Sequence, residues 1–410
     1  MKNNKHQLLI IFLTIFIDLL GFGLIIPIVP FYLEDFVTNP LMIGKTIATM
    51  ITVYSLMQFV FAPIWGRLSD RIGRRPVILL SLAGTGVTHI IFATADSLWL
   101  LFAARILTGI FAATVPTAMA YISDITSTEN RAKGMGMVGA AFGLGFIIGP
   151  AMGGLLSHFG GYQVPLFAAG ALSFFAFIFA YLKLPETVDK QRPVEGDYRR
   201  FNLINLVNAV RHPNIGLLFI IFFTVTMSFA NLETIFALYT ERIFRYDAVE
   251  NGYIFAFIGV ISATVQGVLI GPLAKRFGEK KLITAATLIL GTAFILLPIP
   301  VQLPGFLLVV GMIALGIGLH NPSVIALISK NADQHEQGGI LGLNQSFSSL
   351  GRVLGPLWAG FFFDAYGPAF PFITSGILIL IAAFLSLRLY NRDLLQSKDA
   401  VKKTKTEVSE

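Results

Sequence analysis

The sequence predicts an all-α integral membrane protein with twelve transmembrane helices, arranged as two related six-helix bundles. Three observations lead to this fold class: an apolar composition, twelve apolar runs of spanning length, and blocks of the first half that recur in the second. The chain has 410 residues, of which 55% are hydrophobic and only 13% are charged. Soluble proteins carry about 25% charged residues. Most of the surface of this protein must therefore face lipid.

The apolar runs have the length that a membrane requires. A helix needs about 20 apolar residues to cross the roughly 30 Å hydrocarbon layer. The predicted spans are residues 7–30, 44–64, 76–95, 98–123, 134–158, 163–183, 214–240, 250–274, 282–300, 303–328, 337–363 and 368–388. The first run follows Lys2 and Lys5, but it is too long for a signal peptide and contains Asp18. It also lacks a small-x-small cleavage site, so we expect it to remain as a helix.

The distribution of Lys and Arg predicts the orientation. By this segmentation, the N-terminus, alternate loops and the C-terminal tail hold about 25 of the 30 Lys and Arg residues. The loops of the opposite side hold only Lys45, Arg242 and Arg245. Both termini are therefore expected in the cytoplasm, with the chain as a multi-pass protein of the plasma or inner membrane. The net charge of +7 reflects this topology and does not indicate nucleic acid as a partner.

One long hydrophilic stretch divides the predicted spans into two sets of six. We expect a first bundle at 1–183, a cytoplasmic linker at 184–213, a second bundle at 214–390 and a polar cytoplasmic tail at 391–410.

The two halves carry the same blocks at a nearly constant offset. The recurring residues are Gly66, Leu68, Arg71 and Gly73 with Gly271, Leu273, Arg276 and Gly278; Gly134 with Gly339; and Gly145, Gly149, Pro150 and Gly154 with Gly351, Gly355, Pro356 and Gly360. Two parallel repeats of six helices are typical of transporters that rock around a site near the membrane midplane.

Three motifs carry a resemblance to a known family. They are GRLSDRIGRRP (66–76), RILTG (105–109) and AAFGLGFIIGPAMGG (140–154). The loop motif resembles the signature of the major facilitator superfamily, and the other two are similar to motifs of its twelve-helix drug:proton antiporters, including tetracycline-type and Gram-positive multidrug and quinolone efflux pumps. The resemblance implies alternating access driven by a proton gradient, with a small-molecule substrate, protons and membrane lipid as partners and no bound cofactor.

The charged loop motif has two interpretations. The resemblance implies a conformational latch formed by Asp70, Arg71 and Arg74 with Asp124, which holds the cytoplasmic end closed against the eleventh helix. The alternative is a basic loop that only fixes the topology of the chain.

Glycines in the fifth span fall on one helix face. Gly145, Gly149 and Gly153 are spaced at i, i+4 and i+8, which permits another helix to approach closely. With Pro150, they indicate a bendable helix at the seam between the halves, and Gly355 with Pro356 repeats the pattern in the eleventh span. Ordinary packing and dimerisation are the alternatives; we expect a monomer.

Ionisable residues inside the spans mark candidate sites. Such a group costs at least about 2.5–3.5 kcal/mol at membrane depth. We expect Asp18 and Glu233 to bind protons and Arg105 to be the partner that resets one of them. The alternatives are a packing hydrogen bond for Asp18, an outer-mouth position for Glu233 and a structural tie for Arg105. Further candidates for a substrate cavity are His320, Asn231 and Arg352.

The function that these features favour is proton-coupled export of amphipathic drugs or similar small organic molecules. Proton symport of a sugar or other nutrient and a non-transporting receptor remain alternatives. The sequence does not indicate an enzyme, because no cysteine is present and no nucleophile triad, metal-ligand cluster or phosphate loop is apparent.

Overall fold

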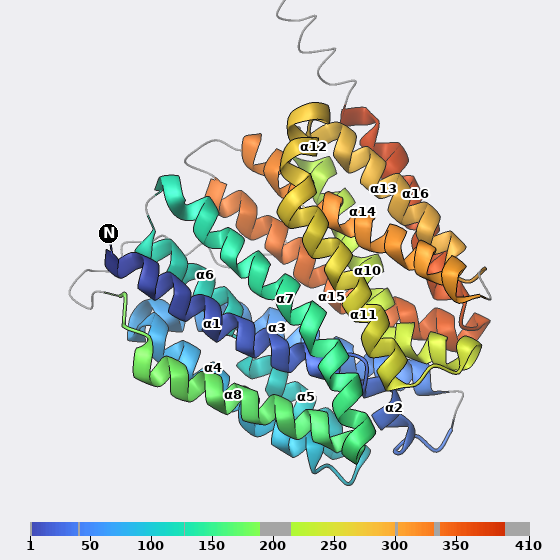
Figure 1. The fold of residues 1–410 in the computed structure, drawn as a ribbon, viewed down its shortest axis with the longest axis horizontal. Coiled ribbons are helices and arrows are strands. Elements are labelled where there is room, and N and C mark those ends of the chain that lie inside the picture. Colours follow the sequence, from blue (N-terminus) through green and yellow to red (C-terminus); the bar gives the residue numbers. More distant parts are fainter. Residues whose placement is uncertain are drawn as a thin grey trace, which may run out of the picture. The chain divides into compact units, whose positions relative to one another are not determined.

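The computed structural model describes residues 2–39, 42–126, 128–188, 215–299, 302–331 and 337–389. Within these ranges the regular elements are helices, with no strand (Figure 1). In chain order they are α1 (Lys2–Ile25), α2 (Val29–Glu34), α3 (Ile43–Ile72), α4 (Arg74–Ala93), α5 (Leu98–Phe111), α6 (Thr114–Ile125), α7 (Thr128–Gly160), α8 (Gln163–Lys183), α10 (Gly216–Phe244), α11 (Ala248–Thr264), the π-helix η2 (Val265–Leu269), α12 (Ile270–Phe277), α13 (Glu279–Leu296), α14 (Leu303–Lys330), α15 (Gln337–Tyr366) and α16 (Phe370–Ser386).

The helices confirm the predicted membrane fold. Each of the twelve predicted spans coincides with one of these helices or with consecutive ones. Among the described residues, nine helical segments are both long enough and apolar enough to cross a bilayer, and α16 is a shorter apolar helix. The eighth predicted span is α11, η2 and α12 in succession, because one turn of π-helix interrupts it.

The fourth predicted span is broken between α5 and α6, and side chains of other helices bond to the backbone at the break. Trp65 donates its indole N–H to the carbonyl of Ile110 at 2.5 Å. Ser81 donates to the carbonyl of Phe111 at 2.5 Å and accepts from the N–H of Ala113 at 3.1 Å. A helix break at membrane depth is tolerated only when neighbouring groups bond the freed backbone in this way.

The chain forms two compact units that do not coincide with its two sequence halves. Unit 1 contains the described residues up to Val188 together with the segments 229–263 and 352–371. Unit 2 contains the described residues of 215–228, 264–351 and 372–389. The predicted first bundle at 1–183 therefore lies within unit 1, whereas the predicted second bundle at 214–390 is divided between the units, with boundaries inside α10 and α15 and near the ends of α11 and α16. Most of the predicted linker and all of the predicted tail lie outside the described residues.

Each unit has an apolar core of interlocking helices. In unit 1, α1 packs between α7 and α8, and α8 also packs along α4 (Figure 1). In unit 2, α13 lies along α14, and a buried cluster that includes Phe219, Val324 and Ile328 joins α10 to α14.

The predicted glycine stripe of α7 is a face of close contact, and its partner is α1. A Cβ atom at Gly149 would lie 2.7 Å from the Cα of Gly23, and one at Gly145 would lie 3.0 Å from the Cβ of Leu19. A Cβ at Gly153 would overlap the carbonyl of Leu24. These three glycines therefore hold two helices of the same sequence half together.

A different face of α7 meets α11 of the second half. A Cβ at Gly154 would lie 2.5 Å from the carbonyl oxygen of Ala248, and one at Gly252 would lie 2.5 Å from that of Pro150. Further along the same pair of helices, a Cβ at Gly259 would lie 2.8 Å from Ile147. Side chains larger than hydrogen would separate the two backbones at these points.

Helices α3 and α15 form a second crossing between the halves. A Cβ at Gly360 would lie 2.8 Å from the carbonyl oxygen of Gly44 and 2.5 Å from the Cβ of Ala48. The backbone N–H of Lys45 donates to Oδ2 of Asp364 at 2.8 Å. We call the α7–α11 and α3–α15 contacts the two glycine crossings; both lie within unit 1.

The α1–α7 contact predicts a position-specific effect of side-chain size. We expect Gly153→Leu to destabilise the protein by about 1–3 kcal/mol, because the new side chain has no space against Leu24. The matched control is Gly139→Leu on the same helix, where a Cβ meets nothing within 4 Å. Thermal unfolding in detergent measures both variants. Equal melting temperatures would show that the close approach is not required.

Candidate functional site

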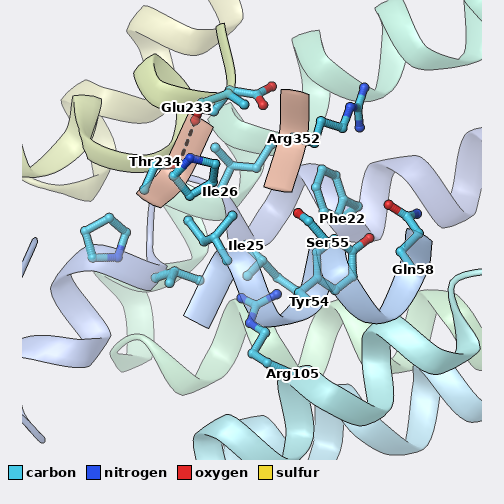
Figure 2. A pocket seen from close by; sticks show the side chains of 15 residues that line it. Phe22, Ile25, Ile26, Tyr54, Ser55, Gln58, Arg105, Glu233, Thr234 and Arg352 are labelled. Atoms are coloured by element: carbon cyan, nitrogen blue, oxygen red, sulfur yellow. Dashed lines mark hydrogen bonds between the residues drawn. The ribbon is translucent and has the colours of Figure 1, made fainter. Parts of the chain in front are cut away.

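A cavity lies in unit 1 where α1, α3, α5, α10 and α15 converge (Figure 2). It contains about 750 Å³ of space not filled by atoms, including its opening. Its lining is mostly apolar and is formed by Phe22, Ile25, Ile26, Val29, Pro30, Ile51, Tyr54, Ser55, Gln58, Arg105, Ala230, Glu233, Thr234, Arg352 and Pro356.

Three of the predicted site residues are charged groups of this cavity. Figure 2 shows Glu233 and Arg352 on one side and Arg105 on the other, with Tyr54 and Ile25 between them. Glu233 comes from α10 and Arg352 from α15, whereas Arg105 comes from α5. The guanidinium group of Arg352 acts electrostatically on Glu233. The cavity thus combines one acid with two permanent cations.

Arg105 owes its position to Gly109, the glycine that ends the motif RILTG. A Cβ at Gly109 would lie 2.8 Å from the Cβ of Met57 and would overlap the carbonyl of Tyr54, so α5 can approach α3 only because this residue is glycine. Arg105 lies one helical turn earlier and is only 7% exposed. Its guanidinium carbon lies 4.5 Å from the centre of the Phe92 ring, in a cation–π contact.

Asp18 lies in α1 and is not among the residues that line the cavity. Its carboxylate accepts a hydrogen bond from the hydroxyl of Thr114. Thr114 in turn lies 2.8 Å from the hydroxyl of Ser81, next to the break between α5 and α6. Among the described residues, Arg105 forms an ion pair with neither Asp18 nor Glu233.

His320 and Asn231, the two remaining candidates for a substrate cavity, are buried outside this cavity. The ring of His320 stacks on Phe222, with 6.1 Å between the ring centres, and its Nδ1 lies 3.2 Å from the side-chain oxygen of Asn321. The amide nitrogen of Asn231 donates to the carbonyl of Pro371 at 2.9 Å. Neither His320 nor Asn231 lines the cavity that the structure describes.

Sequence reasoning missed the polar residues that α3 contributes. Tyr54, Ser55 and Gln58 interrupt the apolar run VYSLMQF (53–59) and all line the cavity. Their spacing of one helical turn was the available signal, since polar side chains on one face of a membrane helix point away from lipid.

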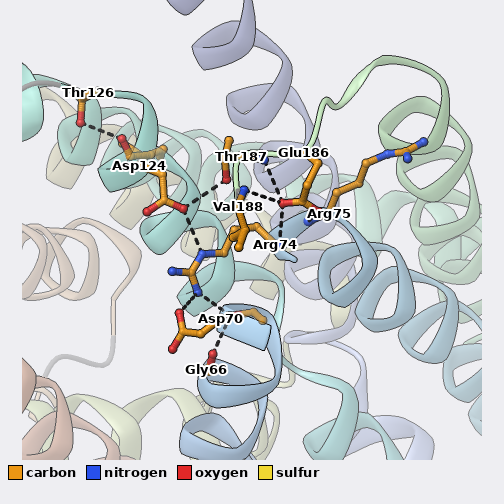
Figure 3. Close-up of polar contacts among 11 residues, drawn as sticks. Gly66, Asp70, Arg74, Arg75, Asp124, Thr126, Glu186, Thr187 and Val188 are labelled. Atoms are coloured by element: carbon orange, nitrogen blue, oxygen red, sulfur yellow. Dashed lines mark hydrogen bonds and ion pairs between the residues drawn. The ribbon is translucent and has the colours of Figure 1, made fainter. Parts of the chain in front are cut away.

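Three of the four predicted latch residues meet in one cluster (Figure 3). Arg74 pairs with Asp70 at 2.5 Å, one turn earlier along the chain, and with Asp124 at 3.0 Å. Arg71 is exposed and forms no ion pair in the part of the chain that the structure describes. The cluster joins α3, α4 and α6 of the first half, and its expected contact with the eleventh helix stays a prediction.

Glu186 is a member of this cluster that the sequence reasoning missed. Its carboxylate accepts the backbone N–H of Arg74 at 2.9 Å and that of Arg75 at 3.2 Å, so it caps the N-terminus of α4. Thr187 donates its hydroxyl to Asp124 at 3.1 Å. The segment that follows α8 is thereby tied to the latch residues (Figure 3). The sequence signal that could have identified Glu186 was an acid in LPET (184–187), directly after the sixth predicted span.

Glu34 and Glu241 form a pair of acids within unit 1. Glu34 ends α2 and faces Glu241 and Arg242 of α10, with Asp35 next to it. Its side chain is exposed to solvent on one side. Partial burial, followed by the negative charge of Glu241, raises the pKa of Glu34 from 4.5 to about 7. In the folded protein the carboxyl of Glu34 therefore binds a proton more readily than a free glutamate does.

Comparison with known proteins assigns these features to one family. The family model described as Major Facilitator Superfamily matches residues 11–356 and 267–409. A tetracycline resistance protein of class G from Vibrio anguillarum is 34% identical over 361 residues, which cover 86% of this chain and 89% of that protein. Multidrug resistance protein 2 of Bacillus subtilis (strain 168) is 31% identical over 392 residues, covering 94% and 96%.

Solved structures share the fold. The human organic anion transporter MFSD10 (TETRAN) is 26% identical, with a TM-score of 0.72 over 93% of this chain and 99% of that one. A nucleoside transporter, NupG, aligns with a TM-score of 0.76 over 94% of this chain and 100% of that one, and its 15% identity supports the fold alone.

The acid pair predicts a pH-dependent stability. Because the folded state raises the pKa of Glu34, it binds more protons than the unfolded state between pH 4.5 and about 7, and stability contributed by this group is lost as the pH rises through that window. We expect Glu34→Gln to melt at a higher temperature than the parent protein at about pH 8 and at the same temperature near pH 4.5. Asp96→Asn, an exposed acid of the α4–α5 loop, is the control. A Glu34→Gln difference that does not vary with pH would contradict the assignment.

Proposed function

We propose that this chain, which belongs to the Major Facilitator Superfamily, exports amphipathic drugs or similar small organic molecules in exchange for protons. The membership makes the chain a multi-pass membrane transporter and not an enzyme. The observation that carries the proposal is Glu233, a carboxyl group that lines a mostly apolar cavity. The tetracycline and multidrug resistance proteins among its relatives support export of drugs.

Glu233 is placed to couple the proton to the substrate. When ionised, it attracts a basic or hydrogen-bond-donating group of a molecule in the cavity; when protonated, it loses that attraction. A charge at membrane depth costs at least about 2.5–3.5 kcal/mol. When Glu233 releases its proton, a group of the substrate or the cation of Arg352 must therefore stabilise the resulting carboxylate. Substrate and proton then exclude one another, which is the requirement for exchange.

The energy available to this exchange is sufficient for extrusion. One pH unit supplies about 1.4 kcal/mol per proton. A potential of 100 mV adds about 2.3 kcal/mol per charge. Together these two contributions, about 3.7 kcal/mol, allow roughly 400-fold export against a gradient for one proton, with no bound cofactor.

Asp18 is the second proposed proton site. Its bond to Thr114 connects α1 to the broken span of α5 and α6, where Ser81 bonds the backbone. A change of proton occupancy at Asp18 therefore acts on the α5–α6 break rather than directly on the cavity. Arg105 as the group that resets a carboxyl remains an expectation.

The latch cluster is proposed to set the balance between two conformations of a monomer whose termini both lie in the cytoplasm. Asp70, Arg74 and Asp124 are only partly exposed, with exposed side-chain fractions of 26%, 13% and 31%. A contribution of a few kcal/mol is the size that biases a two-state equilibrium without locking it.

The proposal is tested in liposomes with an imposed pH gradient and a panel of cationic and zwitterionic drugs. We expect substrate-driven proton flux in the parent protein, and at least a tenfold loss in Glu233→Gln and in Asp18→Asn, because neither amide side chain ionises near neutral pH and neither can bind and release a transported proton. Asp96→Asn, which removes an exposed loop acid, is the matched control and should retain full flux. Flux that persists in the double variant Asp18→Asn with Glu233→Gln would remove the coupling assignment.

A further inference from the structure

Arg105 is a buried cation whose hydrogen-bonding capacity is not used. Its side chain is 7% exposed, and its Nε has no hydrogen-bond partner. Within the described residues it pairs with no carboxylate. The guanidinium group stays protonated in proteins and presents five N–H donors in a planar fork. A buried charge of this kind is normally matched by a hydrogen-bonded anion, because burial without one is costly.

The neighbouring side chains do not provide that anion. Phe92 offers the face of its ring, and Tyr54 offers a phenol. The carboxylate of Asp18 is bonded to Thr114, and Glu233 lies on the opposite side of the cavity beside Arg352 (Figure 2). The remaining side of Arg105 faces the cavity, because Arg105 is one of the residues that line it.

The cavity also has an excess of positive charge. With Glu233 ionised, the two arginines leave a net charge of +1, and with Glu233 protonated they leave +2. A molecule with an acidic group is therefore favoured over a purely cationic one in either state. Its mostly apolar lining suits the apolar body of an organic molecule, because such sites combine apolar walls with a few polar groups.

We propose that Arg105 is the docking group for a carboxylate or similar planar anionic group of the substrate, so that the cavity selects amphipathic acids and zwitterions over simple amphipathic cations. The proposal rests on the proposed function in taking this cavity as the substrate site. The guanidinium fork bonds a carboxylate through two parallel N–H···O contacts, while the apolar side chains of α1 hold the body of the molecule. A basic group at the far pole of a zwitterion is then directed to Glu233.

The test compares two ligands that differ only in the acid. Norfloxacin and its methyl ester share the ring system and the amine, and equilibrium dialysis against the purified full-length chain measures each affinity without a proton gradient. We expect the parent protein to bind the acid roughly ten- to a hundredfold more tightly than the ester, the range for a hydrogen-bonded charged group. Arg105→Gln should bind both compounds with the affinity that the parent shows for the ester.

The second cavity arginine supplies the matched control. Arg352→Gln should retain the preference for the acid, although its absolute affinities change. Arg105→Lys should show a reduced preference, because an ammonium group keeps the charge and loses the planar fork. If Arg105→Gln does not fold, Arg105→Lys serves as the test. An undiminished preference of Arg105→Lys for the acid over the ester would then overturn the proposal.

Several results overturn the assignment. They are equal affinity of the parent for both compounds, an unchanged preference in Arg105→Gln, loss of the preference in Arg352→Gln alone, and binding of neither compound. The proposed function is judged separately, by proton-coupled flux of norfloxacin itself in liposomes. Coupled flux without an acid preference removes only the role of Arg105, and an acid preference without coupled flux removes only the proposed exchange.

Discussion

Close backbone approach at the two glycine crossings is the constraint on which the cavity depends. Segments 229–263 and 352–371 belong to the second half of the sequence, yet they pack with the first half where Gly154 and Gly252 join α7 to α11 and where Gly360 meets Gly44. These segments bring the second half's contribution to the cavity, including Glu233 and Arg352. A larger side chain at a crossing would therefore displace the charged groups without touching them.

Among the described residues, several charges are matched within the protein, and one deeply buried charge is not. Arg74 is shared between two aspartates, and Glu186 bonds backbone N–H groups at the start of α4. Glu233 lies near Arg352. In the part of the chain that the structure describes, Arg105 alone combines near-complete burial with a position on the cavity wall and an unused Nε. In an apolar medium such an arrangement favours a ligand that brings the missing negative charge.

The sequence was sufficient for the helices and for part of the site. Spanning length located the helices, and the cost of charge in lipid singled out Glu233, Arg105 and Arg352, which the structure brings to one cavity. The same argument also selected His320, which is buried in unit 2 instead. Helical periodicity identifies the residues that share one face of a helix, but it does not identify the helix that packs on that face. The stripe in the fifth span therefore did not reveal α1 as its partner. Glu186 acts across 112 residues of sequence, a relation that no local pattern contains.

Exchange requires the cavity to open, and the α3–α15 crossing joins segments of both sequence halves that line it, so we expect this crossing to separate near Lys45 and Asp364 during transport. The chain has no cysteine, so Lys45→Cys with Asp364→Cys introduces one unambiguous pair next to the α3–α15 crossing. The most direct measurement is drug-driven proton flux in liposomes before and after this pair is joined by a short cleavable bis-maleimide, with each single cysteine variant treated in parallel. The account predicts that the cross-link stops flux, that cleavage of the reagent restores it, and that neither single variant is affected. Full flux through a quantitatively cross-linked protein would contradict it.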